Sequence, residues 1–339
     1  MKTLLPFNLV YASSIDDASA KLSAAKGTAM LVAGGTDVMP VLKSRILPTY
    51  PQTVISLQKV AGLDYINMDT DTSTLKIGAL AKIVDIANSG DVRVNFPCLS
   101  EAAGAVASPQ IRNVGTIGGD IMQQVRCWYY RYPNEVGGRI NCLRKGGTTC
   151  YAAAGDNRYH SIFGGPKGCY AASTSDVATA LLALDASMVT NTRTIPVDSF
   201  FDPLAGTVLG DGEILTEIDV PTPPTPTDVC GGGEMENSSW QYFTKFSRRA
   251  SIDFAIASVA VLLTFTGTMC VNARIAMGGV APTPIRATET ENAIISQVVT
   301  TDLAAAAATA TVAKASPLTY NAYKVQILKS LLTAAITPG

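Results

Sequence analysis

Four of the seven cysteines in this chain gather in one segment that shows no secondary-structure pattern. They are Cys127, Cys142, Cys150 and Cys169. Even placement along the chain would put only about one cysteine in a window of that length. The segment around them, residues 126–170, is rich in glycine, tyrosine and arginine and lacks periodic apolar residues. So long a stretch needs a metal or a disulfide to hold it, because it cannot form a core of its own.

From the residues alone, three kinds of cysteine cross-link remain possible for this segment. A [4Fe–4S] cluster takes four thiolates from a chain that wraps around it. A structural zinc site usually contains a closely spaced CxxC-type pair, and this chain has none. Disulfides form in oxidising compartments, but Pro6 and Asn8 interrupt the N-terminal apolar run, which we expect to be a strand and a helix start rather than a signal peptide. The ligand count favours the cluster over the other two.

The charged residues and the single histidine exclude further classes of protein. Lys and Arg number 26 against 27 Asp and Glu, and this balance gives no general attraction to nucleic acid or to an anionic membrane. His160 is the only histidine, which excludes metal sites built on two or more imidazoles, and we interpret it as structural. The uncharged run 254–272 is long enough for a membrane helix. Its β-branched residues and a turn at 266–268 favour two buried strands, so we expect no membrane span.

The spacing of apolar residues predicts helices and strands in an irregular order. With 339 residues, the chain is expected to hold about two domains. A loop or linker is expected at 221–233, which contains four prolines and three glycines. Because strands and helices do not alternate regularly, the order predicts an α+β fold. Predicted helices cover 14–26, 83–89, 175–184, 302–315 and 319–333, and predicted strands cover 30–32, 54–57, 74–79, 241–246, 256–263 and 271–277.

Two glycine-rich turns lie at residues 33–37 (AGGTD) and 116–120 (TIGGD). Paired glycines allow positive φ and let a ligand approach backbone N–H groups closely. Two such turns on one chain are suited to embrace a pyrophosphate, although neither matches GxGxxG or GxxxxGK. Lys245 lies just before Arg248 and Arg249, where a cation either faces the N1/O2 edge of a flavin or is solvated.

Five motifs, taken together and in order, resemble one family. They are residues 31–38 (LVAGGTDV), residues 110–120 (QIRNVGTIGGD), Ser175 and Asp176 at a helix start, Lys245 eight residues before Asp253, and residues 278–286 (GGVAPTPIR). With these motifs the chain resembles, over almost its whole length, the medium, FAD-binding subunit of the xanthine dehydrogenase family of molybdenum hydroxylases. The resemblance implies an α+β fold in two parts. Residues 1–188 would form an FAD-binding domain of the vanillyl-alcohol-oxidase (PCMH) type with subdomains of about 1–57 and 58–188, and 189–339 a C-terminal α+β domain like that of the CO-dehydrogenase flavoprotein.

The segment of about 124–170 resembles a loop that is inserted in one branch of this family and absent from most members. The branch includes the β subunit of 4-hydroxybenzoyl-CoA reductase and the flavoprotein subunit of periplasmic aldehyde oxidoreductases. Its loop carries a [4Fe–4S] cluster on four cysteines, so the resemblance implies Cys127, Cys142, Cys150 and Cys169 as ligands. The spacing between Cys150 and Cys169 is longer than we expect from the reductase, so the resemblance does not define the path of the loop there.

The resemblance also implies which residues hold FAD. The first turn would wrap the pyrophosphate with Leu31, Val32, Ala33, Gly34, Gly35, Thr36, Asp37 and Val38. The second FAD loop would be lined by Thr116, Gly118, Gly119, Asp120 and Gln123. Asp176 would bind the ribityl or adenosine side, and Lys245 would lie near the isoalloxazine. Asp120 departs from the asparagine that is common at its position, because it keeps an acceptor, loses a donor and adds a charge near the phosphates.

The activity implied by the resemblance is electron transfer, with no catalytic residue on this chain. A molybdopterin-containing large subunit would hydroxylate or dehydroxylate an aromatic, heterocyclic or aldehyde substrate, and a small subunit would carry two [2Fe–2S] clusters. This chain would pass electrons between the small subunit and an external carrier such as ferredoxin or NAD(P). We expect a cytoplasmic complex, with export alongside a partner subunit left open. Two alternatives remain, a self-contained FAD oxidase or reductase of the same fold and a non-enzymatic assembly module whose cysteine loop binds zinc.

Overall fold

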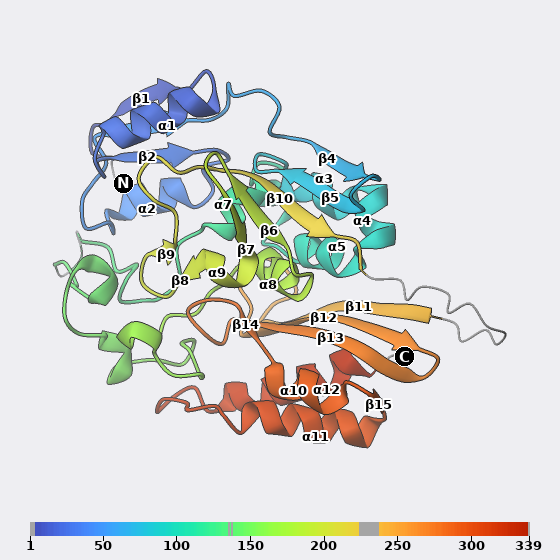
Figure 1. Cartoon of the computed structure of the whole chain (residues 1–339). Coiled ribbons are helices and arrows are strands. Elements are labelled where there is room, and N and C mark those ends of the chain that lie inside the picture. Colours follow the sequence, from blue (N-terminus) through green and yellow to red (C-terminus); the bar gives the residue numbers. More distant parts are fainter. Residues whose placement is uncertain (1–3, 135, 137, 224–236, 338–339) are drawn as a thin grey trace.

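The computed structural model describes residues 4–134, 136, 138–223 and 237–337, and it begins with a small parallel sheet (Figure 1). Its three strands pair in the order β1-β3-β2. Parallel strands need a crossover connection, which α1 provides between β1 and β2. Ser14 caps α1 by accepting a hydrogen bond from the N–H of Asp17. The elements are β1 (Asn8–Tyr11), α1 (Ile15–Ala24), β2 (Ala29–Val32), α2 (Val38–Ser44) and β3 (Thr53–Ser56).

A second, antiparallel sheet pairs strands from distant parts of the chain. Its order is β4-β5-β10-β6-β7, so β10 lies between β5 and β6. Buried side chains of this sheet form one core with those of α3, α5 and α8. The elements are β4 (Ile66–Asp69), β5 (Thr74–Gly78), α3 (Ile83–Asn88), α4 (Gly90–Asn95), α5 (Pro97–Gly104), α8 (Asp176–Ala183), β6 (Ser187–Thr190), β7 (Thr194–Pro196) and β10 (Leu215–Pro221).

This pairing moves the division between the two parts of the chain. The sequence places the division at residue 188, yet β6, β7 and β10 continue the sheet of β5 as far as Pro221. We therefore place the division between β10 and the next strand, in the proline-rich region expected to be a linker, of which residues 224–236 lie outside the described residues. No local pattern reveals the pairing of β10 with β5, because it joins segments far apart in the sequence.

The C-terminal sheet has helices on both faces. Strand β12 lies between β11 and β13, and nine of its ten side chains are buried. Ala260 and Leu262 belong to the core of α5 and α8, whereas Val259 and Val261 belong to the core of α12, because alternate residues of a strand face opposite sides. The elements are β11 (Asn237–Phe246), β12 (Ala257–Thr266), β13 (Met269–Gly278), β14 (Ile285–Arg286), α10 (Thr288–Ile294), β15 (Gln297–Val298), α11 (Thr301–Val312) and α12 (Tyr323–Ile336).

The uncharged run 254–272 therefore forms strands and not a membrane helix, as predicted. No helix in the part of the chain described here is long and apolar enough to cross a bilayer. The cysteine segment is irregular, with three short 3-10 helices at Leu143–Lys145, Tyr151–Ala153 and Pro166–Gly168. The remaining elements are α6 (Pro109–Arg112), α7 (Ile117–Ile121), α9 (Val197–Phe200), β8 (Phe201–Asp202) and β9 (Gly206–Thr207).

Candidate functional site

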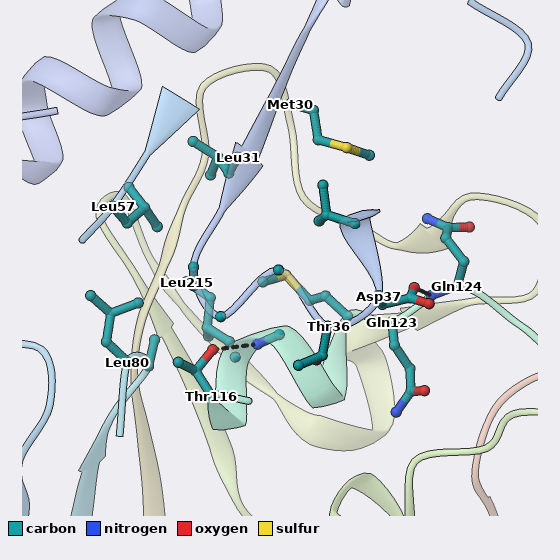
Figure 2. A pocket seen from close by; sticks show the side chains of 18 of the residues that line it. Met30, Leu31, Thr36, Asp37, Leu57, Leu80, Thr116, Gln123, Gln124 and Leu215 are labelled. Atoms are coloured by element: carbon teal, nitrogen blue, oxygen red, sulfur yellow. Dashed lines mark hydrogen bonds between the residues drawn. The ribbon is translucent and has the colours of Figure 1, made fainter. Parts of the chain in front are cut away.

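The two glycine-rich turns meet at one cavity of about 170 Å³ (Figure 2). The first turn connects β2 to α2, and the second leads into α7. The predicted residues that line the cavity are Leu31, Ala33, Gly34, Gly35, Thr36, Asp37, Val38, Thr116, Gly118, Gly119 and Gln123. Val32 is not among them; it ends β2, and its carbonyl accepts a hydrogen bond of 2.9 Å from the N–H of Leu57. The fold thus brings together turns that are about 80 residues apart in the sequence.

Close packing and backbone conformation explain the glycines of the first turn. A Cβ on Gly34 would lie 2.1 Å from the carbonyl oxygen of Val114, and Gly35 has a φ of +72°. Among the described residues, no acceptor binds the backbone N–H groups of residues 34–38. Successive free N–H groups form a concave anion site. The first turn is therefore suited to bind phosphate groups.

The second turn presents a glycine to the cavity. Thr116 caps α7, and its Oγ1 accepts a hydrogen bond of 3.3 Å from the N–H of Gly119. Gly118 packs on the backbone, with the carbonyl oxygen of Ala79 only 2.9 Å from the place of a Cβ. Gly119 is exposed, and near the place of its Cβ the only close atom is Thr116 Oγ1 at 3.1 Å. A larger side chain at position 119 would therefore fill the cavity.

One end of the cavity is apolar, and no sequence motif marks it. Figure 2 shows Leu31, Leu57, Leu80 and Leu215 around this end, with Met30 on the other side of β2. These side chains come from the ends of strands in both of the first two sheets. Apolar walls with a few placed polar groups are typical of sites for aromatic cofactors. In its own segment each residue looks like an ordinary core residue, so the amino-acid sequence does not indicate that it lines a ligand site.

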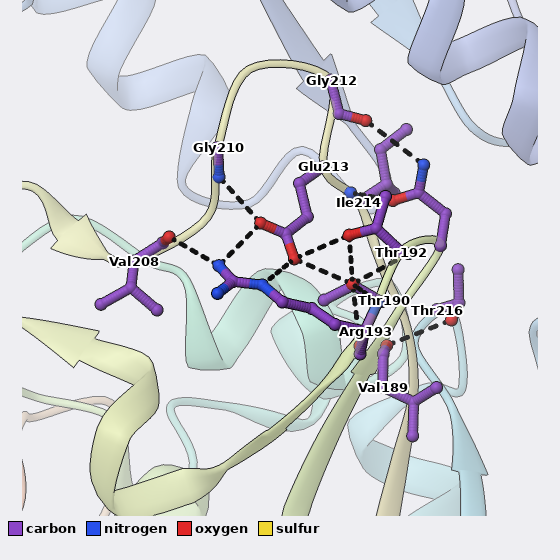
Figure 3. Close-up of polar contacts among 11 residues, drawn as sticks. Val189, Thr190, Thr192, Arg193, Val208, Gly210, Gly212, Glu213, Ile214 and Thr216 are labelled. Atoms are coloured by element: carbon purple, nitrogen blue, oxygen red, sulfur yellow. Dashed lines mark hydrogen bonds and ion pairs between the residues drawn. The ribbon is translucent and has the colours of Figure 1, made fainter.

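A buried carboxylate holds part of this apolar wall in place (Figure 3). Glu213 Oε1 accepts hydrogen bonds from Arg193 Nε at 2.8 Å and Thr190 Oγ1 at 2.9 Å. Its Oε2 accepts another, of 2.9 Å, from the N–H of Gly210. The hydrogen bond from Arg193 is the main cause that lowers the pKa of Glu213 to about 2. The next residue, Ile214, lines the cavity, so Glu213 fixes the loop that carries it.

A second cavity, of about 80 Å³, continues from the first. Asp120, Asp176 and Lys245 line it, although they come from α7, α8 and β11. Asp120 of the second FAD loop, Asp176 predicted for the ribityl or adenosine side and Lys245 predicted for the isoalloxazine therefore lie together. The residues shared by both cavities are Thr36, Asp37, Thr116, Gly119 and Gln123.

Asp176 and Lys245 form a buried ion pair in the second cavity. Lys245 Nζ donates to Asp176 Oδ2 at 2.6 Å and to the carbonyl oxygen of Ala105 at 3.0 Å. Burial raises the pKa of Asp176, and Lys245 opposes that rise. Asp176 Oδ1 is buried without a hydrogen-bond partner within the described residues. Buried polar atoms are rarely left unpaired, so this oxygen is suited to accept a bond from a ligand.

Asp120 lies beside this pair and is held by neighbouring side chains. Its Oδ2 accepts a hydrogen bond of 2.5 Å from Ser175 Oγ, and its Oδ1 accepts one of 2.9 Å from Gln123 Nε2. Burial raises the pKa of Asp120 to about 7, although the hydrogen bond from Ser175 opposes the rise, and the charge of Asp176 adds to it. Near neutral pH, Asp120 therefore carries only part of the negative charge that an aspartate adds at this position.

The carboxylate of Asp37 contacts the cysteine segment and not the Asp176–Lys245 pair. Arg126 Nη1 and Arg131 Nη2 lie 2.5 Å and 2.7 Å from Asp37 Oδ1, and the N–H of Gln124 donates to Oδ2 at 2.8 Å. Burial opposes ionisation, but the two arginines outweigh it and hold the pKa of Asp37 below its usual value. Asp37 therefore ties the first turn to the start of the cysteine segment.

Comparison with known proteins agrees with this arrangement. The family described as the FAD binding domain in molybdopterin dehydrogenase matches residues 5–223. The CO dehydrogenase flavoprotein C-terminal domain matches residues 241–338. The chain belongs to this family of FAD-binding subunits. The two matches confirm the predicted fold class, an FAD-binding domain followed by a CO-dehydrogenase-flavoprotein-like domain.

Relatives of this family align along nearly the whole chain. The FAD-binding subunit of an aldehyde oxidoreductase from Escherichia coli is 33% identical, covering 91% of this chain and 90% of its own. The carbon monoxide dehydrogenase medium chain of Hydrogenophaga pseudoflava is 28% identical, covering 90% and 85%. A solved carbon monoxide dehydrogenase from that organism, which lacks the Mo-pyranopterin moiety, superposes with a TM-score of 0.74 at 26% identity, covering 98% and 97%. The chain is thus a medium subunit of a molybdenum hydroxylase and a component of an oxidoreductase.

The side chains and backbone of the two cavities fit FAD. The free N–H groups of residues 34–38 suit its pyrophosphate, and the apolar end suits one of its ring systems. At the second cavity, Thr174 Oγ1 and Asp176 Oδ1 are buried oxygens without a partner in the described residues, and the hydroxyls of the cofactor can bind them. Bound FAD supplies a redox group that accepts and releases electrons.

The four predicted cysteines of this medium subunit also lie together. Cys127, Cys142, Cys150 and Cys169 line one small cavity of about 10 Å³. Among the described residues, no group of three or more Cys, His, Asp or Glu side chains is arranged to hold a metal ion. The six cysteines that the structure describes are free, and Cys230 lies outside the described residues.

The cysteines of this cavity are mostly buried, and polar groups contact their sulfurs. Burial raises the pKa of the Cys127 thiol to about 12, although the N–H groups of Tyr130 and Tyr129 donate to its sulfur and lower it. His160 Nε2 lies 3.2 Å from Cys127 Sγ, and burial lowers the pKa of His160 to about 4. His160 is therefore neutral at physiological pH, and its ring contacts one of the four cysteines of the segment.

Proposed function

We propose that this chain is the electron-transfer flavoprotein of a molybdenum hydroxylase complex. It passes electrons between a small subunit with two [2Fe–2S] clusters and an external carrier such as ferredoxin or NAD(P). A molybdopterin-containing large subunit carries out the substrate chemistry. The observation that carries this proposal is the continuous pair of cavities, whose free N–H groups, apolar end and unpaired buried oxygens suit the parts of one FAD. That pair lies in a chain that aligns with medium chains over nearly its full length.

Within these cavities, we propose that residues 31–38 hold the pyrophosphate and that Lys245 lies beside the isoalloxazine. The free N–H groups of the first turn support the first assignment. Lys245 uses two of its three donors on Asp176 and Ala105, which leaves one for the cofactor. The unpaired oxygen of Asp176 supports a contact with a ribityl hydroxyl. These residues bind and orient the cofactor and have no acid–base role.

We propose an aldehyde as the substrate of the complex, because a relative that is 33% identical is named for aldehyde oxidation. This chain purified from its native cells is expected to retain a molybdenum-containing partner and to oxidise aldehydes only with it. Full activity of a preparation without molybdenum would favour the alternative of a self-contained FAD oxidase. Retention of the partner without aldehyde activity would contradict the substrate class alone.

We propose further that the cysteine segment holds a [4Fe–4S] cluster, as in the branch that includes the 4-hydroxybenzoyl-CoA reductase β subunit. Four cysteines around one cavity supply the thiolates that such a cluster takes. Backbone N–H groups already donate to the sulfur of Cys127, and hydrogen bonds to ligand sulfurs are usual around these clusters. The cavity of about 10 Å³ is smaller than a cluster, so the cysteine side chains have to move apart when it is assembled.

Replacing one cysteine tests the binding of the cluster independently of the binding of FAD. In Cys142→Ser the iron signal is expected to be lost while FAD is retained, because Cys142 lines the cysteine cavity and neither FAD cavity. Iron analysis and acid-released flavin fluorescence measure the two contents. Cys98→Ala is the control, since Cys98 is buried in the core of the second sheet and is expected to leave both contents unchanged. Full iron content in Cys142→Ser, or zinc in the parent chain, would contradict the proposal that these cysteines hold an iron–sulfur cluster.

A further inference from the structure

We propose that a cleft beside the second cavity binds a planar, negatively charged small molecule, and that the cysteine segment supplies one of its walls. Resting on the function proposed above, this would be the place where an outside molecule meets the flavin end of the site. The cleft has a volume of about 540 Å³, which is within the range of small-molecule sites. Arg126, Thr174 and Phe254 line both the cleft and the second cavity, so the two are continuous.

Aromatic side chains make the cleft suited to a flat ligand. Trp128 and Tyr159 come from the cysteine segment, and their ring centroids lie 5.7 Å apart at an interplanar angle of 54°. Trp128 is 44% exposed and Phe254 is 42% exposed. Large aromatic rings that share one cleft and stay open to solvent favour stacking with a conjugated ring system.

The charges in the cleft select an anion. Arg126 and Arg249 line it, but each is paired with an aspartate, Asp37 at 2.5 Å and Asp253 at 2.7 Å. Arg248 also lines the cleft and is exposed. Within the described ranges, no carboxylate lies at ion-pair distance from Arg248. Its guanidinium is therefore the positive charge left for a sulfonate, phosphate or carboxylate group of the ligand.

The cleft links the two redox sites of the proposed function. Trp128 follows Cys127 directly in the sequence, and Arg126 precedes it. Arg248 Nη1 donates to the hydroxyl of Tyr159 at 3.2 Å, which joins the strand side of the cleft to the cysteine segment. A ligand held by Trp128 and Arg248 would thus lie between the flavin end of the FAD site and the segment proposed to hold the cluster.

Two anthraquinones, one anionic and one neutral, serve as probes of the cleft. Anthraquinone-2-sulfonate is the anionic probe, 2-(hydroxymethyl)anthraquinone is its neutral match, and calorimetry on the FAD-loaded chain measures their binding. Arg248→Gln is expected to weaken the sulfonate about tenfold and to leave the neutral compound unchanged, because one charge-assisted contact is lost. Trp128→Leu is expected to weaken both probes about tenfold, since both stack. Arg93→Gln, an exposed arginine of α4 outside the cleft, is the control and is expected to change neither.

The outcomes distinguish this site from the FAD site. Sulfonate binding only to FAD-free protein would mean that the cofactor itself fills the cleft, and equal binding by Arg248→Gln and the parent chain would mean that Arg248 holds no ligand. Either result would overturn the proposal while the function proposed above stands, provided that the parent chain contains FAD. A parent chain without FAD would instead overturn the function, and FAD content is therefore measured in every variant.

Discussion

Replacing Lys245 with methionine is expected to destabilise the chain strongly, because it leaves a buried charge without its partner. Lys245 Nζ lies 2.6 Å from Asp176 Oδ2, and the two side chains are 10% and 4% exposed. At an effective dielectric constant of about 20, unit charges at that distance attract by about 6 kcal/mol, much of which offsets lost hydration. Removing one partner of such a pair typically lowers the free energy of unfolding by about 3–5 kcal/mol.

The loss of unfolding free energy in Lys245→Met depends on pH, because Asp176 can take up a proton. Burial already raises the pKa of Asp176, and Lys245 opposes that rise. In Lys245→Met the opposing charge is absent, so the pKa in the folded state rises further above its value in the unfolded state. A carboxyl with a higher pKa in the folded state binds protons better when folded, so low pH favours folding and the penalty grows as pH rises through the folded pKa. The destabilisation is therefore expected to be larger at pH 8 than at pH 5.

Urea unfolding followed by circular dichroism measures this effect. With a slope of about 3 kcal/mol per M, Lys245→Met is expected to lower the midpoint by about 1 M at pH 8 and by less at pH 5. The double variant Lys245→Met/Asp176→Asn removes the buried charge and is expected to regain most of the loss. Lys21→Met, which breaks an exposed pair with Asp17, is the control and is expected to shift the midpoint little. A double variant as unstable as Lys245→Met, or the same loss at both pH values, would refute the reasoning.

Two further predictions concern the FAD cavities. Glu213→Ala is expected to lower the free energy of unfolding by about 2 kcal/mol and to weaken FAD binding, because Arg193 loses its acceptor and the loop with Ile214 loosens; unchanged affinity in an FAD titration would contradict its positioning role. Burial raises the pKa of Asp120 to about 7, so it loses its proton as pH rises, and its charge then repels the pyrophosphate. FAD affinity is therefore expected to fall between pH 6 and pH 8 in the parent chain and to stay level in Asp120→Asn, and an equal fall in both would exclude this cause.

The glycine turns and the cysteine segment can be predicted from the sequence because they restrict which residue types their positions accept. Gly35 needs a positive φ, and Gly34 has no room for a Cβ beside the carbonyl oxygen of Val114, so both positions require glycine. The four cysteines are concentrated where no apolar periodicity exists, and the structure places them around one cavity. A position that accepts only one residue type can be recognised in a single sequence.

The apolar wall and the polar contacts that fix it have causes that are not local. Leu57, Leu80 and Leu215 follow or begin three different strands, and each is an ordinary core residue in its own segment. Leu80 and Leu215 meet because β10 pairs with β5, the same pairing that carries the second sheet beyond residue 188, whereas Leu57 reaches them from the end of β3 in the first sheet. The altered pKa of Asp120 likewise depends on burial and on Asp176, neither of which the sequence displays.

The FAD content of Gly119→Leu tests most directly whether the cavity between the two glycine turns holds the cofactor. Gly119 is exposed at that cavity, so a leucine there fills the space without displacing backbone. Gly90→Leu is the matched control, because no heavy atom lies within 4 Å of the place of its Cβ. The parent chain and the control are expected to release about one FAD per chain, and Gly119→Leu less than about a tenth of that, with an unchanged circular dichroism spectrum. A full complement of FAD in Gly119→Leu would contradict the account.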